Sequence, residues 1–379
     1  MARILHTADV HIGKLFEQFG TFGRQLRTQI RETFRKVLDL AASQRVDAVI
    51  LAGDIFDSDK IAIADIRFFM DAVNSIRPIP VFFLPGTWTH DSVYQKAIFR
   101  SHQFLDGKPE NLYVFSHEVP ETFRVASGEL AIHGRAVLPE TDNPLDGIGH
   151  DPQAAFNVGI LHTAIALPQI PLEAGSCALK RDHLEACGLD YLALGHWHSF
   201  RRYYEDAKTL VQYSGSPETL SFEEDSGYVA LVTLGGASPH IEKRRVGHYS
   251  WNELSLSWQD VGSAEALKKQ LASLASPQTI LKVVITGSIS DKQLVDWNRV
   301  MEEMASQFAY LRFDTSQVKE ELPLEELEHD YRENTVQRAF VTLVGEALEK
   351  TKNATDKQQL REVLRRGHAL FQGYEEVAQ

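Results

Sequence analysis

Residues 2–13 read ARILHTADVHIG, a short apolar run that ends in a polar turn containing Asp9 and His11. The apolar run predicts a β-strand, and the two polar residues follow it directly. Because side chains alternate along an extended segment, residues two apart point to the same side. A carboxylate and an imidazole can therefore meet one cation here. By itself, the Asp-x-His pair is more often typical of a solvated loop that caps a helix, so its meaning depends on the rest of the chain.

Helical and strand-like segments alternate after this first strand. Apolar residues spaced three to four apart predict a helix over residues 24–44, and residues 47–51 form an apolar run typical of a buried strand. A second helix over residues 63–76 and a further strand over residues 81–84 repeat the pattern. This β-α-β opening indicates a domain that combines a sheet with covering helices.

Short apolar runs separated by turn residues dominate the next part of the chain. The runs are residues 112–115, 122–125, 130–133, 157–162, 191–194 and 228–234. They predict a mixed sheet or a two-sheet core with flanking helices. The fold class is therefore α/β, in its α+β variety.

The pattern changes again near residue 247. Predicted strands at 254–256 and 280–286 alternate with predicted helices at 264–274 and 291–308. After an acidic segment, two amphipathic helices are predicted near residues 336–350 and 356–372. We therefore predict three parts, residues 1–246, 247–318 and 319–379.

Five loops at strand ends hold side chains that can bind metals. They contain Asp9 and His11, Asp54 within Gly53-Asp54-Ile55-Phe56-Asp57, His90 with Asp91, His162, and both histidines of Gly195-His196-Trp197-His198. Any one of these histidines is more often a buried structural residue than a ligand, but five such loops together are hard to explain structurally. Carboxylates and imidazoles without thiolates suit manganese, iron or zinc, and two such ions about 4 Å apart clamp phosphoester oxygens and generate hydroxide. The pattern predicts phosphoester hydrolysis.

The composition is that of an ordinary globular protein. The chain has 379 residues, of which 43% are hydrophobic and 24% charged, and a formal net charge of −13. The sequence shows neither a secretion signal nor a long uncharged apolar run, so we expect no membrane segment and a cytoplasmic location. Two cysteines are too few for a disulfide framework and predict free thiols. The negative charge argues against a surface that is basic throughout, but local basic patches can still bind DNA.

The ordered motifs Asp9-Val10-His11, Gly53-Asp54-Ile55-Phe56-Asp57, His90-Asp91, His162 and Gly195-His196-Trp197-His198 resemble the signature of the calcineurin-like metallophosphoesterases. Within that superfamily, residues 6–13 (HTADVHIG) and 212–218 (QYSGSPE) resemble the SbcD family of DNA double-strand-break repair nucleases. The resemblance implies a two-sheet β core flanked by helices for residues 1–246, the nuclease domain. It also implies a small α/β capping domain that contacts DNA for residues 247–318, and C-terminal helices that dock a partner for residues 319–379.

The same resemblance assigns a role to each motif residue. Asp9, His11 and His198 would hold one divalent ion, and His162 and His196 the other. Asp54 would bridge the two ions. His90 would protonate the leaving group or stabilise the transition state, oriented by Asp57. The expected cofactors are two divalent ions, with Mn²⁺ as the expected metal.

One loop departs from the family pattern. Where the family reads Gly-Asn-His-Asp, this chain reads Gly86-Thr87-Trp88-Thr89-His90-Asp91, so the asparagine ligand of the second metal is missing. The hydroxyl of Thr89 is a poorer substitute, which predicts weak occupancy of the second site. Three interpretations remain open: a working site with changed metal affinity, a site active only with DNA or a partner bound, and a largely inactive subunit.

The resemblance also implies partners, namely DNA, an SMC-like coiled-coil ATPase and a second copy of the chain. The apolar stripes of the C-terminal helices fit docking on such an ATPase, or packing onto the chain's own body. Arg201 and Arg202 could contact DNA phosphates, although such residues are more often solvated surface charges. We expect a metal-dependent DNA repair exo/endonuclease. The alternatives are an inactive DNA-binding scaffold and a phosphodiesterase for small nucleotides.

Overall fold

The computed structural model describes most of the chain. The described residues are 1–58, 61–86, 102–115, 117–137, 141–167, 177–185, 187–204, 208–236, 239–257, 261–289, 291–320, 324, 327, 331–333 and 335–375. The predicted site residues Thr89 and His90 lie outside this part. The chain divides into two compact units: residues 1–252 with 278–280, and residues 253–277 with 281–379. The three-part division drawn from the sequence stays a prediction.

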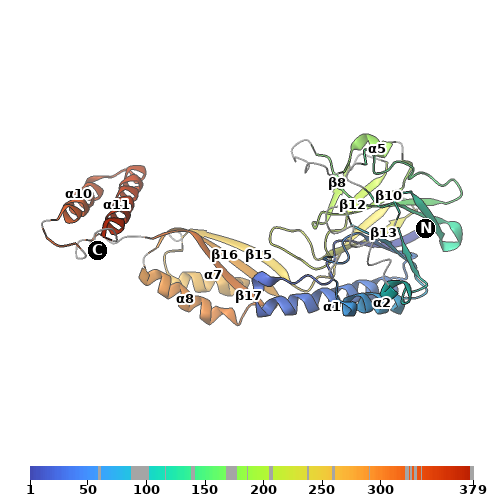
Figure 1. Cartoon of the computed structure of the whole chain (residues 1–379), viewed down its shortest axis with the longest axis horizontal. Helices are drawn as coiled ribbons and strands as arrows, with labels where there is room; N and C mark the ends of the chain where they lie inside the picture. Colours follow the sequence, from blue (N-terminus) through green and yellow to red (C-terminus); the bar gives the residue numbers. More distant parts are fainter. Residues whose placement is uncertain are drawn as a thin grey trace. The chain divides into compact units, whose positions relative to one another are not determined.

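The strands of the first unit (Figure 1) form two six-stranded sheets. This confirms the two-sheet core that the family resemblance implied, one of the two arrangements that the apolar runs left open. The first sheet, in spatial order, consists of β14 (His240–Arg245), β13 (Tyr228–Leu234), β1 (Ala2–Thr7), β2 (Ala48–Ala52), β3 (Val81–Leu84) and β4 (Leu112–Val114). The second consists of β11 (Arg201–Tyr203), β12 (Leu210–Tyr213), β10 (Tyr191–Gly195), β7 (Phe156–His162), β6 (Leu130–Gly134) and β5 (Glu121–Val125). The described part of this unit also contains a separate pair of strands, β8 (Ala164–Ile165) and β9 (Ala178–Leu179).

The core of the first unit lies between the two sheets. Buried residues from both sheets form one cluster that includes Ile4, Ile50, Phe82, Ile132, Ile160, Ala193 and Val232. Successive side chains of β3 point to opposite faces of the first sheet. Phe82 stacks on Tyr113 in this core, whereas Phe83 lies 5.6 Å from Phe69 in the covering helix layer.

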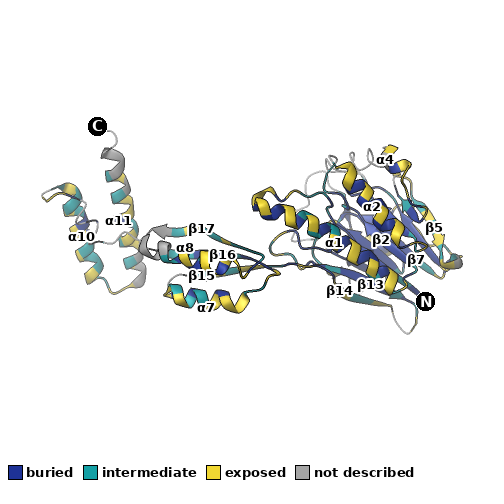
Figure 2. Ribbon diagram, turned by 90° about the horizontal axis from the view of Figure 1, so that it is seen from below, coloured by how far each residue is buried: buried dark blue, intermediate teal, exposed yellow. Residues whose placement is uncertain are grey.

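Helices cover the outer face of the first sheet (Figure 2). The helices described in this unit are η1 (Glu17–Phe19), α1 (Thr21–Ser43), α2 (Ile63–Ser75), α4 (His102–Leu105), η2 (Ala126–Gly128) and α5 (Arg181–Glu185). The predicted stripe of α1 is confirmed, because Ile30, Phe34 and Val37 are fully buried. Phe34 stacks on Phe69 of α2, so the two long helices pack on the sheet as one layer.

The second unit has a three-stranded sheet with strand order β15-β16-β17. Its described elements are β15 (Ser250–Ser257), α7 (Ala264–Leu274), β16 (Thr279–Ile289), α8 (Asp291–Ala305), β17 (Tyr310–Glu320), α10 (Val336–Lys350) and α11 (Ala354–Glu375). Alternate residues of β16, Leu281, Val283 and Ile285, are buried with Trp297 of α8. Helices α10 and α11 form a hairpin around Val341, Val344 and Leu364. No helix within the described residues has the length and apolar character that crossing a membrane requires.

The sequence analysis missed several strands, among them β14 and β17. Strand β14 reads HIEKRR and alternates charged with partly buried residues, because it is the edge strand of its sheet. Strand β17 is an edge strand too, and it turns the expected β-α-β-α pattern of the small region into a three-stranded sheet. In these two edge strands the exposed positions carry polar or charged residues, so their sequences lack the apolar runs that predict strands.

A buried histidine joins the two sheets. His6 of β1 is fully buried, and its Nδ1 lies 2.7 Å from the hydroxyl of Tyr191 in β10. Burial lowers the pKa of His6 from 6.5 to about 3. The folded protein therefore keeps His6 neutral, whereas the unfolded chain protonates it below about pH 6.5.

We expect this histidine to make the first unit sensitive to acid. The unfolded state binds one more proton than the folded state between about pH 6.5 and 3, so the free energy of unfolding falls by about 1.4 kcal/mol per pH unit on acidification. A His6→Asn variant should be less stable at pH 7 but should lose less stability on acidification. Urea unfolding at several pH values measures this, with exposed His240→Asn as the control. Parallel pH curves for wild type and His6→Asn would contradict the assignment.

Candidate metal centre

Four strands end at one place in the first unit and position the predicted ligands there. β1 leads to Asp9 and His11, and β2 leads to Asp54; these two strands are parallel neighbours. In the second sheet β7 ends in His162 and its parallel neighbour β10 leads to the loop that contains His196. Since parallel neighbours end at the same edge, each sheet presents its polar residues together.

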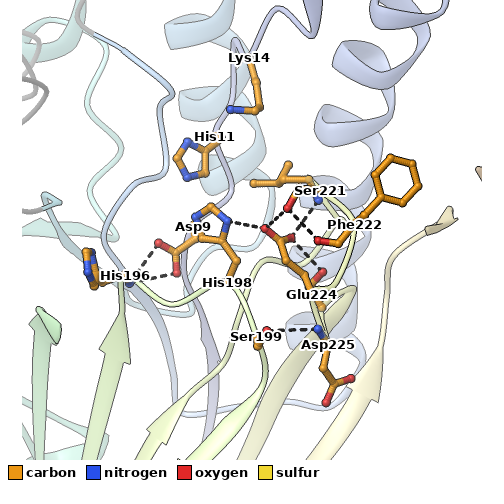
Figure 3. A network of polar contacts seen from close by, with 12 residues as sticks. Asp9, His11, Lys14, His196, His198, Ser199, Ser221, Phe222, Glu224 and Asp225 are labelled. Atoms are coloured by element: carbon orange, nitrogen blue, oxygen red, sulfur yellow. Dashed lines mark hydrogen bonds and ion pairs between the residues drawn. The ribbon is translucent and has the colours of Figure 1, made fainter. Parts of the chain in front are cut away.

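The predicted ligands form two sets that share one carboxylate. One possible ligand atom from each of Asp9, His11 and His198 lies within 4.8 Å of the others, and the same holds for Asp9, Asp54 and His162. His196 lies beside the second set, with its ring centroid 5.7 Å from that of His162. Its backbone N–H donates to the carboxylate of fully buried Asp9 at 3.1 Å (Figure 3).

Three of the histidines are held through Nδ1. Nδ1 of His11 lies 3.0 Å from Oδ1 of Asp57, and Nδ1 of His198 lies 2.9 Å from Oε1 of Glu224. Nδ1 of His162 donates to the backbone carbonyl of Ala52 at 2.7 Å. An acceptor at Nδ1 leaves Nε2 with a lone pair for a metal. Within the described residues, Nε2 of His11 is buried without a hydrogen-bond partner, and Nε2 of His162 lies 3.4 Å from Oδ2 of Asp54, itself a predicted ligand. Both atoms fit the role of metal ligands.

The loops are held in backbone conformations that side-chain-bearing residues seldom adopt. Asp9, His11 and Asp54 all have φ near +50°, and His196 has φ +111°. Backbone hydrogen bonds join the loops, including Asp9 N–H to the carbonyl of Gly53 and His11 N–H to that of Asp54. Such conformations persist where the surroundings enforce them, which is common at functional sites.

Buried charge of both signs fills the site. Burial opposes ionisation of Asp54, but the neighbouring His162 outweighs burial and holds the pKa of Asp54 well below its usual range. Burial likewise opposes protonation of His162, yet Asp54 and Asp9 raise its pKa to about 9. Burial raises the pKa of Asp9 itself. The two carboxylates therefore need a cation between them, and without a metal the proton on His162 supplies part of that charge.

The calcineurin-like phosphoesterase family profile matches residues 2–200, which contain all the ligand sets described above. This chain belongs to that family. Calcineurin-like phosphoesterases are hydrolases that act on phosphoester bonds with divalent metals, and the two possible ligand groups agree with this.

Several known proteins are similar to this chain in sequence. The DNA double-strand break repair protein Mre11 of Aeropyrum pernix is 29% identical over 80% of this chain and 76% of its own length. The SbcD component of the nuclease SbcCD of Bacillus subtilis is 27% identical over 67% of this chain and 70% of its own length. The uncharacterized metallophosphoesterase YhaO of Bacillus subtilis is 27% identical over 69% of this chain and 65% of its own length.

The sequence analysis did not predict the contact between Glu224 and His198, and it predicted a different partner for Asp57. Glu224, which bonds His198, belongs to none of the motifs and lies 26 positions away in the chain. Asp57 was expected to orient His90; in the described part of the chain it bonds Nδ1 of His11 and, at 3.3 Å, Lys14. Its contact with His90 stays a prediction, because His90 lies outside that part.

Three glycines allow the loops to approach this closely. A Cβ at Gly53 would lie 2.0 Å from Nδ1 of His162, and one at Gly86 would lie 1.7 Å from Oδ1 of Asp54. A Cβ at Gly195 would lie 1.9 Å from the carbonyl oxygen of Ala52. Real Cβ atoms do not come this close to other heavy atoms, so any side chain at these positions displaces a ligand or its support.

A shallow cavity opens beside the ligands. It has a volume of about 340 Å³ and is lined by His196, Trp197, His198, Ser199, Arg201 and Glu224. Arg201 and Arg202 are both exposed on β11. Of the two predicted phosphate contacts, Arg201 lines this cavity.

Proposed function

We propose that this phosphoesterase is a metal-dependent exo/endonuclease subunit that hydrolyses DNA phosphodiester bonds in double-strand-break repair. The observation that most strongly supports a nuclease centre is the pair of ligand sets sharing buried Asp9, whose three histidines, His11, His162 and His198, are each held at Nδ1. The named functions of the relatives in Aeropyrum pernix and Bacillus subtilis support DNA as the substrate. Arg201 in the adjoining cavity supports a phosphate backbone as the ligand.

In this proposal Asp9, His11 and His198 would hold one divalent ion, and His162 and His196 would hold the other. Asp54 would be a ligand of both ions, and Asp9, which belongs to both ligand sets, lies close enough to the second ion to affect it too. When bound, two such ions stabilise the charge on phosphoester oxygens and make water nucleophilic at neutral pH. Asp57 orients His11, and the backbone N–H of His196 holds the Asp9 carboxylate in place. We propose Mn²⁺ as the metal.

The loop from Gly86 to Asp91 supplies the remaining roles in the proposal. His90 gives a proton to the leaving oxygen. Thr89 replaces the missing asparagine as a weak ligand, so the second ion binds less tightly than the first. The loop also supports a second candidate function, a DNA-binding scaffold with little turnover. Elemental analysis separates the two, because one ion or none per chain favours the scaffold.

The decisive experiment is Mn²⁺-dependent degradation of linear double-stranded DNA by wild type and by Asp54→Ala and His90→Ala variants, with and without an SMC-like ATPase. We expect cleavage by wild type and none by either variant. Absence of cleavage by folded wild-type protein, even with the ATPase and Mn²⁺ present, would rule out the nuclease. A small-nucleotide substrate assayed in parallel tests the alternative phosphodiesterase.

We further propose that the C-terminal helix pair docks on the coiled coil of an SMC-like ATPase. Exposed apolar residues repeat at seven-residue spacing on each helix: Val336 and Leu343 on α10, and Val363 and Leu370 on α11. Leu343 is 72% exposed although Val344 beside it is buried in the hairpin. A stripe that the hairpin does not bury fits the apolar seam of a partner helix. The homodimer implied by the family resemblance and the cytoplasmic location remain parts of this proposal.

We expect Leu343→Glu to weaken binding to the ATPase. Burying a leucine side chain contributes about 1.5–3 kcal/mol, so its loss should lower the affinity by about 10–100-fold. The neighbouring exposed Thr342→Glu adds the same charge off the stripe and should bind as wild type does. Co-purification and binding titrations of both variants measure this. Equal affinities of the two variants would show that α10 does not dock through Leu343.

A further inference from the structure

Glu224 is the centre of a hydrogen-bond network beside the metal ligands (Figure 3). It lies in the loop between β12 and β13, and its side chain is only 15% exposed. Its Oε1 lies 2.9 Å from Nδ1 of His198 and accepts from the Ser221 hydroxyl at 2.7 Å. Its Oε2 accepts from the backbone N–H of Leu220 at 3.3 Å and the hydroxyl of Ser226 at 3.4 Å. The carboxylate is therefore fixed within its own loop.

The loop around Glu224 is in turn anchored on both sides. Nζ of Lys243 in β14 donates to both carboxylate oxygens of Asp225 at 2.7 Å. The backbone N–H of Asp225 donates to the hydroxyl of Ser199 at 3.1 Å. Phe222 packs edge-on against Trp251 at 5.0 Å between ring centroids. These contacts connect the loop to the segment that follows His198 and to residues outside the site. Glu224 is thus held rigidly against His198.

The hydrogen bond between His198 and Glu224 decides which nitrogen of His198 is left for a metal. A carboxylate only accepts hydrogen bonds, so Nδ1 of His198 donates to Glu224 and Nε2 keeps the lone pair. Asp9 and His11 lie on the other side of the ring, with the His11 centroid 5.1 Å away. Without Glu224 the imidazole could carry its proton on either nitrogen and rotate about its side-chain bonds. His11, another ligand of the same set, is held in the same way, because its Nδ1 lies next to the carboxylate of Asp57.

We propose that Glu224 is a positioning residue of the metal centre, which fixes the tautomer and orientation of His198 and thereby sets the affinity of the Asp9–His11–His198 site. This inference rests on the metal binding proposed above. Acceptors in this position raise the basicity of a ligand histidine, and their removal lowers metal affinity by about 10–100-fold in other proteins. Glu224 touches no substrate in this proposal and acts only through His198.

Calorimetric titration of the metal-free full-length protein with MnCl₂ tests the proposal. We expect Glu224→Ala to weaken one of the two binding events by about 10–100-fold and to leave the other unchanged. Glu224→Gln should lose less, because its amide oxygen still accepts from Nδ1. Exposed Glu223→Gln removes the same charge one residue away and should bind as wild type does. Glu224→Gln also covers the case in which Glu224→Ala fails to fold, as judged by circular dichroism.

A double-mutant cycle shows whether Glu224 acts through His198. In a His198→Ala background we expect Glu224→Ala to have no further effect on Mn²⁺ affinity. If the two losses add, Glu224 acts as a general negative charge and the proposal is wrong. Wild-type affinity at both sites in a folded Glu224→Ala variant also overturns it. If wild type itself binds no Mn²⁺, the proposed metal binding is wrong, and with it the proposed function. If wild type binds Mn²⁺ and Glu224→Ala binds it equally well, only the proposed role of Glu224 is wrong.

Discussion

Replacing Asp9 with asparagine should abolish hydrolysis and at the same time make the metal-free protein more stable. Asp9 is the only residue common to both ligand sets among the described residues, so its loss removes a ligand from each. Metal ions supply several kcal/mol of transition-state stabilisation, and each 1.36 kcal/mol is a factor of about ten, so we expect the rate to fall by about a thousandfold or more.

The expected gain in stability follows from burial. Asp9 is fully buried and burial raises its pKa, so keeping it ionised at neutral pH costs folding free energy when no metal is present. Asparagine has nearly the same shape, can still accept from the backbone N–H of His196, and carries no charge to desolvate. The melting temperature in chelator should therefore rise, whereas Mn²⁺ should stabilise the wild type and leave Asp9→Asn unchanged.

Asp65→Asn is the matched control because Asp65 is equally buried in the same unit. Its carboxylate accepts from Arg27 and Arg31, each at 2.8 Å, so its loss should lower the free energy of unfolding by about 1–3 kcal/mol. Metal content and activity should stay at the wild-type level. Thermal melts with and without chelator, together with elemental analysis, measure both quantities. An Asp9→Asn variant that keeps two ions per chain would disprove the shared role of Asp9.

The Gly53→Ala substitution should remove the second ligand set through a steric clash. Gly53 has φ +94°, where an alanine costs about 1–3 kcal/mol in any protein, and the added Cβ would lie 2.0 Å from Nδ1 of His162. His162 must then move away from Ala52 and Asp54, so we expect loss of one Mn²⁺ site and of hydrolysis in addition to the backbone cost.

The Gly128→Ala variant is a control that has the backbone strain of Gly53→Ala without its steric clash. Its φ is +93°, almost the same as that of Gly53, but a Cβ there would meet nothing within 4 Å. Gly128→Ala should therefore show the strain alone, with normal metal binding. Thermal melts and Mn²⁺ titrations of both variants give the comparison. Identical behaviour of the two variants would mean that the fit of His162 against Gly53 does not matter for the site.

Much of the candidate site could be predicted from the sequence, because its ligands are local features of strand ends. Asp9, Asp54, His162 and His196 each follow a buried apolar run, and parallel strands bring such positions to one edge. The structure places these residues together, and the family comparison confirms the phosphoesterase class. The roles assigned to the individual residues stay predictions, including those of Thr89 and His90 outside the described part of the chain.

The sequence by itself determined most strands of the core and the order of the metal-binding motifs, since apolar periodicity and strand-end motifs are properties of short segments. The resemblance carried by those motifs then pointed to the family and to the two-sheet arrangement. Only the tertiary structure decided which acceptor holds each histidine: Asp57 for His11, the Ala52 carbonyl for His162 and Glu224 for His198. Each of these histidines lies between 26 and 110 residues from its acceptor in the chain. Their contacts depend on how loops from different strands pack, and no pattern within one segment records that packing.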